Sequence, residues 1–462
     1  MTFGTDDSAA DPSAADVLQR LRAQVGDAVS SDPIALAATR SDKSGHISGA
    51  APLAIVTARS IEDVQATMRI ATETRTPVVT RGAGTGLAGG AIAGAGEIVL
   101  STLALDRVLE VSVEDELAVI EPGIINAELN ARLAPHGLWF APDPASRAIS
   151  TVGGNIATNA GGLLCAKYGV TREAVLGLKV VLADGRLLNL GHRTVKGVTG
   201  LDLTALMIGS EGTLGVIVEA TVRLRPVVRG PVPTIRASFA SVGDAARASA
   251  AITASGLRPS IMELIGESAL VAIADYLGVE QPVGSQLIVQ TDGPGAIREA
   301  DAALAIIRSL GAVAELTDDP VEADRLLAFR RSMHPAMVAL GTVLIEDVCV
   351  PRSQLPAMFA AIGGIEAKYG ISIPTVAHAG DGNLHPNFLY VGEEVPDTIW
   401  SAAGELFLEA LRLGGTLTGE HGIGLLKRRW LRDELGDDQF ELQRQVKRVF
   451  DPLGILNPGK VF

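Results

Sequence analysis

Cysteine, aromatic side chains and long apolar runs are all scarce in this chain of 462 residues. With 2 cysteines it cannot build a disulfide framework, a cysteine-rich zinc module or an iron–sulfur cluster of its own. No apolar run approaches the ~18 residues of a membrane-spanning helix. The first residues, MTFGTDDSAADPSA, are acidic where a secretory signal would be positively charged. We therefore expect no transmembrane segment and a cytoplasmic location, and a peripheral contact with a membrane stays open.

Basic residues are also fewer than acidic ones. The 39 Lys and Arg residues face 53 Asp and Glu residues, which gives a formal net charge of −14. Because binding along a nucleic acid needs basic surface, this balance argues against a nucleic-acid partner. The hydrophobic share of 47% and the charged share of 20% are those of a globular protein and exclude global disorder. At roughly 150 residues per domain, the length predicts two or three domains.

Glycine, in contrast, is abundant, with 51 residues. The loop RGAGTGLAGG at 81–90 contains a G-x-G-x-x-G pattern, which would suggest a Rossmann dinucleotide site. That site needs a helix to begin within the glycines. Here glycines continue to Gly96, and each one in a helix costs about 1 kcal/mol relative to alanine, so we reject the Rossmann site. The free amides of such a loop can cradle an anion without a helix, although the loop alone is equally typical of a mobile turn.

Two further glycine clusters favour a ligand-lining role. Residues 150–162, STVGGNIATNAGG, interleave small apolar residues with amides and hydroxyls, and residues 209–217, GSEGTLGVI, have the same character. Small residues let the backbone approach a ligand closely, while the polar groups provide hydrogen bonds. A surface linker has no use for that mixture. The best linker is instead RPVVRGPVP at 225–233, which has three prolines in nine residues.

Taken in order, RGAGTGLAGG, TVGGNIATNAGG, LGLKVVLADG and TGLDLTALMIGSEGTLGVI resemble the FAD-binding domain of the vanillyl-alcohol-oxidase-type flavoproteins. The resemblance extends over about residues 30–462. It points to the FAD-linked D-2-hydroxyacid dehydrogenases, the family of D-lactate dehydrogenase, D-2-hydroxyglutarate dehydrogenase and the glycolate oxidase flavin subunit. The implied fold is α+β, with a two-subdomain, PCMH-type (vanillyl-alcohol-oxidase-like) FAD-binding domain and an α+β substrate-binding cap domain with an antiparallel sheet.

The resemblance also divides the chain. We expect a disordered tail at 1–14, the FAD-binding domain at 15–227 and the cap domain with a metal site at 228–425. A helical segment at 426–462 is expected to return to the FAD-binding domain. The proline-rich linker at 225–233 falls where the first domain gives way to the second.

How FAD is held is implied by the same resemblance. Several relatives attach FAD covalently through a histidine in the first loop, where this chain has Ala83, Gly84 and Thr85, so non-covalent FAD is expected. The pyrophosphate would be held by Arg81, Gly82, Ala83, Gly84, Thr85, Gly86, Gly89 and Gly90. The rest of the cofactor would be lined by Pro142, Asp143, Thr151, Gly153, Gly154, Asn155, Thr158, Asn159, Glu211, Ile217 and Asn457.

A cluster of histidines stands near the C-terminus, where three of the seven fall between positions 378 and 421. In TVAHAGDGNLHPNF at 375–388, the Asp-Gly pair between alternating apolar residues predicts a two-residue hairpin turn. That register places His378 directly opposite His385, with Cβ atoms about 5 Å apart on one face. Asn387, two residues further on, joins this face. Two imidazoles so close together suit one metal ion.

The loop GGTLTGEHGIG at 414–424 adds Glu420 and His421, an oxygen ligand and a separate imidazole. Two imidazoles and a carboxylate with an open position match catalytic zinc or another borderline divalent ion. We therefore predict His378, His385 and Glu420 as metal ligands, although any one of these histidines alone is more often structural. The resemblance implies the same three ligands, with His421 as the general base.

The segment LAFRRSMHPA at 327–336 resembles the part of the family that carries the arginine for the substrate carboxylate. We match that arginine to Arg330, with Arg331 as the competing choice; an arginine fork suits a carboxylate. The implied reaction, with His421, Arg330 and Asn387 as catalytic residues, is oxidation of a D-2-hydroxyacid to the 2-oxoacid. The hydride passes to FAD and the electrons leave to an external acceptor that the sequence does not identify.

The sequence leaves more than one possibility for the substrate and for the assembly of the protein. The hydroxyglutarate-type enzymes have a lysine where Ile345 stands, which favours D-lactate or a similar monocarboxylate here. D-2-hydroxyglutarate stays open if Arg331 or Arg352 supplies the missing charge. The chain could also be the flavin subunit of a glycolate-oxidase-like complex without turnover of its own. A homodimer is compatible with the sequence, which does not decide the oligomeric state.

Overall fold

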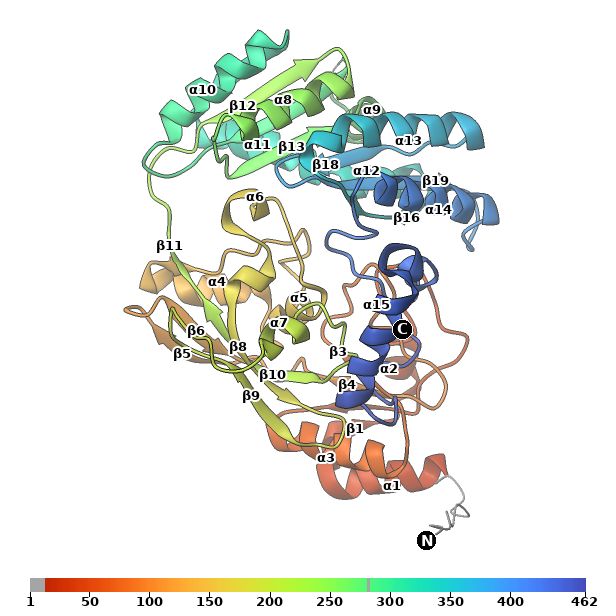
Figure 1. Ribbon diagram of the computed structural model, residues 1–462. Helices are drawn as coiled ribbons and strands as arrows, with labels where there is room; N and C mark the ends of the chain where they lie inside the picture. Colours follow the sequence, from red (N-terminus) through yellow and green to blue (C-terminus); the bar gives the residue numbers. More distant parts are fainter. Residues whose placement is uncertain (1–12, 281–282) are drawn as a thin grey trace.

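The computed structural model describes residues 13–280 and 283–462 (Figure 1). The tail expected at 1–14 lies outside the described residues apart from Ser13 and Ala14. Ser13 caps helix α1 (Ala14–Val25), because its hydroxyl accepts a hydrogen bond from the backbone amide of Asp16. These two residues therefore begin a helix rather than end a tail.

The first layer is a four-stranded sheet in the order β1-β2-β4-β3, in which β4 pairs in parallel with both neighbours. Helix α3 (Ile61–Glu73) packs on this sheet together with α1, and Ser60 caps it by accepting a hydrogen bond from the Asp63 amide. The loop between β3 and β4 carries the first glycine cluster and contains no helix, as the sequence predicted. The strands are β1 (Val29–Ser30), β2 (Ala54–Thr57), β3 (Val78–Arg81) and β4 (Ile98–Ser101).

The second layer is a five-stranded antiparallel sheet in the order β5-β6-β10-β8-β9. Helix α5 (Val152–Thr158) arises from the second glycine cluster, and Thr151 caps it by accepting a hydrogen bond from the Gly154 amide. Helices α4 (Asn126–Leu133) and α5 pack their apolar residues on this sheet. The strands are β5 (Val108–Ser112), β6 (Leu117–Ile120), β8 (Val175–Val181), β9 (Leu187–Gly191) and β10 (Val216–Arg223).

The second part of the chain forms an eight-stranded antiparallel sheet in the order β15-β12-β14-β13-β18-β19-β16, with β17 paired to β19. Its first strand follows the proline-rich linker, whose start pairs as β11 (Arg225–Pro226) with β7 (Leu138–Trp139). The strands are β12 (Thr234–Phe239), β13 (Ile261–Ile265), β14 (Ser285–Gln290), β15 (Val313–Thr317), β16 (Thr342–Ile345), β17 (Val348–Cys349), β18 (Thr375–His378) and β19 (Asn383–Tyr390).

Helices cover both faces of this large sheet. One face packs against α8 (Val242–Ala254), α10 (Ala296–Ser309), α13 (Leu355–Tyr369) and α14 (Asp397–Arg412). The other face packs against α9 (Glu267–Leu277) and α12 (Met333–Leu340). Strand β13 shows why: Met262 and Leu264 point into the first core, while Ile261 and Ile265 point into the second. Glu263 lies between Ile261 and Ile265 on the second face.

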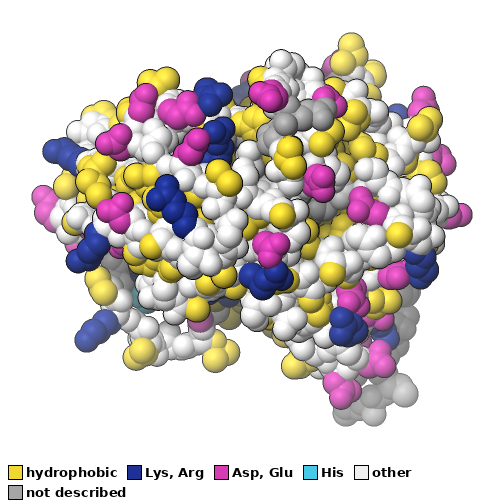
Figure 2. All heavy atoms as spheres, turned by 90° about the horizontal axis from the view of Figure 1, so that it is seen from above, with side chains coloured by type: hydrophobic (Ala, Val, Ile, Leu, Met, Phe, Trp, Pro, Cys, Tyr) yellow, Lys and Arg dark blue, Asp and Glu magenta, His cyan; other side chains and the backbone are white. Residues whose placement is uncertain are grey.

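The C-terminal segment returns to the first part of the chain (Figure 1). Helix α15 (Leu431–Phe450) leads from the large sheet down to β3, where Leu456 forms a parallel bridge with Val78. Lys447 fixes this return by donating hydrogen bonds to the carbonyl oxygens of Thr213 and Leu456. Within the described residues, no helix is both long and apolar enough to cross a membrane. Figure 2 shows basic and acidic side chains interspersed over one face rather than gathered into a basic patch.

Candidate active site

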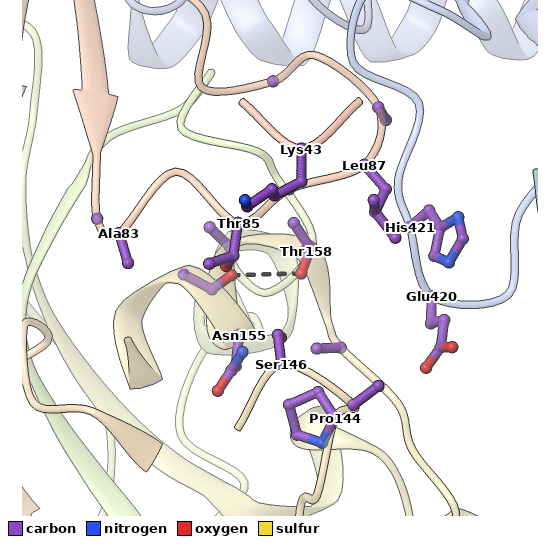
Figure 3. Close-up of a pocket in the computed structure, with 18 of the residues that line it drawn as sticks. Lys43, Ala83, Thr85, Leu87, Pro144, Ser146, Asn155, Thr158, Glu420 and His421 are labelled. Atoms are coloured by element: carbon purple, nitrogen blue, oxygen red, sulfur yellow. Dashed lines mark hydrogen bonds between the residues drawn. The ribbon is translucent and has the colours of Figure 1, made fainter. Parts of the chain in front are cut away.

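A cavity of about 660 Å³ lies between the two parts of the chain. Glycine loops of the first part form one side, and the large sheet with the loop after α14 forms the other. Figure 3 shows Glu420 and His421 on that loop, across the pocket from Thr85, Asn155 and Thr158. One cavity therefore brings together the glycine clusters and the histidine cluster, which are far apart in the sequence.

Most of the residues expected to hold FAD line this cavity. The first and second glycine loops meet closely: a Cβ on Gly82 would lie 2.3 Å from Oγ1 of Thr151, so only glycine fits there. The loops and small side chains leave a cradle that a flavin dinucleotide fits. The expected residues that line it are Gly82, Ala83, Gly84, Thr85, Gly86, Gly90, Thr151, Gly153, Gly154, Asn155, Thr158, Glu211 and Ile217.

Four of the six other expected FAD residues form hydrogen bonds that brace the loops from outside the cavity lining. The guanidinium of Arg81 donates hydrogen bonds to the carbonyl oxygens of Ala91 (2.6 Å) and Ser41 (2.9 Å). Asn457 donates to the carbonyl oxygens of Gly90 (2.9 Å) and Glu211 (2.7 Å). The structure therefore gives Arg81 and Asn457 a role in shaping the cradle.

The remaining braces act on the second glycine cluster and its surroundings. Asp143 accepts a hydrogen bond from the Leu164 amide at 3.0 Å, and Asn159 accepts one from the Arg172 amide at 2.9 Å. The residues expected at the cofactor that lie outside the lining are Arg81, Gly89, Pro142, Asp143, Asn159 and Asn457.

The histidine hairpin has a different register from the predicted one. β18 and β19 pair His378 with Asn383 and Val376 with His385, so the connection is four residues long, from 379 to 382. The Asp-Gly pair takes the last two of these positions. A Cβ on Gly382, at φ +94°, would lie 2.1 Å from the Val350 carbonyl oxygen, and this close approach fixes the turn. The prediction of direct opposition was wrong by two residues.

His378 and His385 still share one face of the sheet as diagonal neighbours. Their ring centroids lie 4.9 Å apart. Oε1 of Glu420 lies 3.6 Å from Nε2 of His378 and 3.1 Å from Nε2 of His385. The ligand atoms of these three residues all lie within 4.8 Å of one another. The three predicted ligands therefore converge on a point that could hold a metal ion.

Glu263, which the sequence analysis did not single out, orients this cluster. It is fully buried and lies directly opposite His378 on the neighbouring strand β13. Its Oε1 is 2.6 Å from Nδ1 of His378 and its Oε2 is 2.9 Å from Nε of Arg330. A carboxylate at Nδ1 keeps the proton there and leaves Nε2 free as a ligand, which is the usual support of a metal-binding histidine.

Burial and neighbouring charges shift the pKa values of several groups in this cluster. Burial alone would raise the pKa of Glu263, but positive charge on His378 and Arg330 holds that pKa below its usual value. Burial lowers the pKa of His421 to about 4, against the opposing influence of Asp347. The imidazole of His421, stacked on His385 with ring centroids 5.2 Å apart, is therefore neutral near pH 7 and able to accept a proton.

The two candidate arginines differ in their surroundings. Arg330 is buried and held by Glu263, while Arg331 is exposed, and both line the cavity. Arg147 lines the same cavity. Although Arg331 as a whole is exposed, its guanidinium is partly desolvated, and this desolvation, followed by the charge of Arg147, lowers the pKa of Arg331. Ile345 also lines the cavity, as does Asn387, whose side-chain amide donates hydrogen bonds to backbone carbonyl oxygens.

Several candidate functional residues could not be identified from the sequence, because the residues that they contact are distant in sequence. Glu263 is the only charged residue in the apolar strand IMELI, and Asp347 interrupts the apolar run VLIEDVCV. A carboxylate within a buried apolar segment needs a partner, so this pattern could have flagged both, together with Glu346 beside Asp347. Arg147, in contrast, stands in a loop with no such signal.

Comparisons with known proteins identify the family of the chain. Residues 52–191 match the FAD binding domain family, and residues 231–461 match the family described as FAD linked oxidases, C-terminal domain. The glycolate oxidase subunit GlcD of Bacillus subtilis is 39% identical over 419 residues, covering 89% of each chain. The D-lactate dehydrogenase of Archaeoglobus fulgidus is 37% identical over 419 residues, covering 88% of this chain and 90% of the relative.

The fold agrees as well. The solved structure of p-cresol methylhydroxylase with substrate bound superposes with a TM-score of 0.80 over 97% of this chain and 96% of that chain, at 17% identity. This likeness, the FAD binding domain match and the antiparallel sheets confirm the predicted fold class. The chain therefore belongs to the FAD-linked oxidase family, together with the glycolate oxidase subunits and D-lactate dehydrogenases that it resembles over most of its length.

Proposed function

We propose that this FAD-linked oxidoreductase is a dehydrogenase that oxidises a D-2-hydroxyacid to the 2-oxoacid with non-covalent FAD. The observation that carries the proposal is the convergence of His378, His385, Glu420 and His421 at one end of the cavity whose other end is lined by the FAD loops. An anionic substrate fits this end because Arg330 lies beside the cluster, linked to it through Glu263.

The chain's division follows from this assignment. We assign FAD binding to residues 15–227, the substrate and metal groups to 228–425, and the returning segment to 426–462. Residues 15–227 form one wall of the cavity and residues 228–425 form the other, so the cavity exists only where these two parts pack together. The return of the chain at Leu456 and the brace from Asn457 to Gly90 support this assignment of the last segment.

A divalent metal ion fits the three predicted ligands. His378 and His385 would offer Nε2 and Glu420 an oxygen, a donor set that suits zinc. A bound ion would polarise the 2-hydroxyl of the substrate as a Lewis acid. The buried carboxylate of Glu263 behind His378 is the kind of support that metal-binding histidines have.

The residues of the chain then divide the remaining work. Because Nε of Arg330 faces Glu263, the other end of its guanidinium is left to bind the substrate carboxylate. His421 takes the proton of the 2-hydroxyl as general base. Asn387, on the same sheet face as His385, helps to orient the substrate. A bound FAD would supply the acceptor for the hydride that leaves C2.

Two substrate classes remain in competition. Ile345 lines the cavity and favours a short monocarboxylate such as D-lactate. Arg331 lines it too, beside Arg147, and favours a second carboxylate as in D-2-hydroxyglutarate. Arg352 is not part of the lining, so the second class depends on Arg331. The relatives named D-lactate dehydrogenase support the first class.

The relatives named glycolate oxidase subunit suggest a second function, as the flavin subunit of a complex without turnover of its own. One experiment on the purified chain distinguishes the independent dehydrogenase from the flavin subunit of a complex. The purified chain is assayed with a panel of D-2-hydroxyacids and an artificial electron acceptor. We expect turnover and bound FAD. Bound FAD with no turnover by any acid, regained after a partner subunit is added, would favour the subunit function.

A further inference from the structure

A buried carboxylate holds the loop that carries Glu420 and His421. Asp347, fully buried in the turn between β16 and β17, accepts hydrogen bonds from the backbone amides of Gly419 (2.6 Å) and Glu420 (2.7 Å). The amide of His421 also points to it at 3.3 Å, and the hydroxyl of Thr418 donates to it at 2.9 Å. One side chain thus gathers four consecutive residues of the loop.

Lys427 is the counter-ion of this carboxylate. Its ammonium group is 1% exposed and donates hydrogen bonds to the Asp347 carboxylate, to the Asp347 carbonyl oxygen at 2.8 Å and to the Leu417 carbonyl oxygen at 3.1 Å. Lys427 follows the loop and Leu417 precedes it, so the ammonium group ties both ends of the loop together. A buried charge without such a partner would cost several kcal/mol.

The position of the Asp347–Lys427 pair beside Glu420 and His421 indicates a role in the reaction and not in folding alone. The atoms held by Asp347 are the backbone of Glu420 and His421, and its Oδ1 lies 3.5 Å from Nδ1 of His421. On the far side, the carboxylate of Glu211 accepts hydrogen bonds from the amides of Ile423 (2.7 Å) and Gly424 (2.8 Å). The loop is therefore fixed from both sides of the cavity.

We propose that Asp347, with Lys427 as its counter-ion, is a positioning residue that fixes the distances of Glu420 and His421 from the histidine pair. The proposal rests on the proposed metal site. It assigns to the pair a role in metal affinity and proton transfer without contact with the substrate.

The test measures zinc binding, separately from turnover. Asp347→Asn, the triple variant Glu346→Gln/Asp347→Asn/Lys427→Met, which removes the lysine and both buried carboxylates that pair with it, and the milder Thr418→Val are compared with the wild-type chain. FAD content from the flavin absorbance reports folding, and competition with a chelator gives the zinc dissociation constant. We expect FAD to stay bound and zinc affinity to fall at least tenfold in both Asp347 variants, with a smaller loss in Thr418→Val.

The matched control is Asp451→Asn. Asp451 pairs with Lys447 and accepts hydrogen bonds from the amides of Ile455 (3.0 Å) and Leu456 (2.8 Å), so it uses the same device on a loop without metal ligands. Its substitution should lower the melting temperature and leave zinc affinity within twofold of wild type. An equal loss of zinc affinity in the control would overturn the proposal.

The remaining outcomes are decisive too. Zinc affinity within twofold of wild type in FAD-bound Asp347 variants overturns the proposal. If neither Asp347 variant retains FAD, an unchanged zinc affinity in Thr418→Val overturns it. If the wild-type chain binds no zinc, the proposed metal site fails, and hydrogen exchange then tests positioning alone. Faster exchange of the amides at 419–421 in Thr418→Val supports it, and unchanged exchange contradicts it.

Discussion

Glu263 and His378 face each other across two adjacent strands, with Oε1 of the carboxylate 2.6 Å from Nδ1 of the imidazole. The second oxygen of the same carboxylate lies 2.9 Å from Nε of Arg330. A single buried group thus orients a predicted metal ligand and the predicted anchor of the substrate carboxylate. The two functions are therefore expected to fail together when this group is altered.

Glu263→Gln tests that coupling. The amide keeps the shape but loses the charge that fixes the proton on Nδ1 of His378 and holds Arg330. We expect a 10- to 100-fold loss of zinc affinity, typical of such support groups, with a rise in KM for the hydroxyacid. Glu219→Gln, which alters a salt bridge to Lys179 on another sheet, is the control. A change in KM without a change in zinc affinity would show that the groups are not coupled.

Substitution of each arginine by methionine, which keeps the apolar stem of the side chain and removes the guanidinium, distinguishes the roles of the two. Arg330→Met removes the fork held by Glu263, and we expect KM to rise about 10- to 100-fold for every acid, from the loss of a charged hydrogen bond of about 1.5–3 kcal/mol. Arg331→Met should act mainly on acids with a second carboxylate. Steady-state kinetics on D-lactate and D-2-hydroxyglutarate decide, and the reverse pattern would make Arg331 the anchor.

His421→Ala should bind FAD as wild type does and lose turnover. General-base catalysis contributes 10²- to 10⁴-fold, and we expect a loss of kcat in that range. His192→Ala, at an exposed histidine that is not part of the cavity lining, controls for a loss of histidine alone. Retention of more than a tenth of the wild-type kcat in His421→Ala would exclude His421 as the base.

Glu211 gives the stability of the protein a pH dependence. Burial raises the pKa of this carboxyl from 4.5 to about 7. Between these values the folded chain binds the proton more tightly than the unfolded chain, so stability falls as the pH rises. Glu211→Gln removes this titration. We expect wild type to lose about 2–3 kcal/mol more than the variant between pH 5 and pH 8, measured by urea unfolding. Parallel pH curves would contradict the assignment.

The sequence predicted the parts of the site whose signal is local. Glycine in the loop after β3 excludes a helix whatever surrounds it. His378 and His385 share one face, as predicted, because a register that differs by two residues leaves the alternation of side chains unchanged. The exact register was not predictable from the Asp-Gly pair. It depends on the approach of the Val350 carbonyl oxygen to Gly382, a contact between distant segments.

The roles of bracing residues depend even more on tertiary contacts. Arg81 stands in the first glycine loop, yet its guanidinium reaches the carbonyl oxygen of Ser41 instead of lining the cavity. Glu263 meets its partner 115 residues further on. Sequence reasoning can mark such buried charges as needing a partner, but only the fold identifies which partner each one meets.

Flavin reduction in the absence of oxygen tests the proposed reaction most directly. The FAD-bound chain is mixed anaerobically with D-lactate, L-lactate or D-2-hydroxyglutarate, and the flavin absorbance is followed by stopped flow. We predict that a D-2-hydroxyacid bleaches the flavin, that its L-enantiomer does not, and that His421→Ala and His385→Ala with full FAD content stay oxidised. An oxidised flavin with every D-2-hydroxyacid, or reduction of either variant at the wild-type rate, would contradict the proposed function.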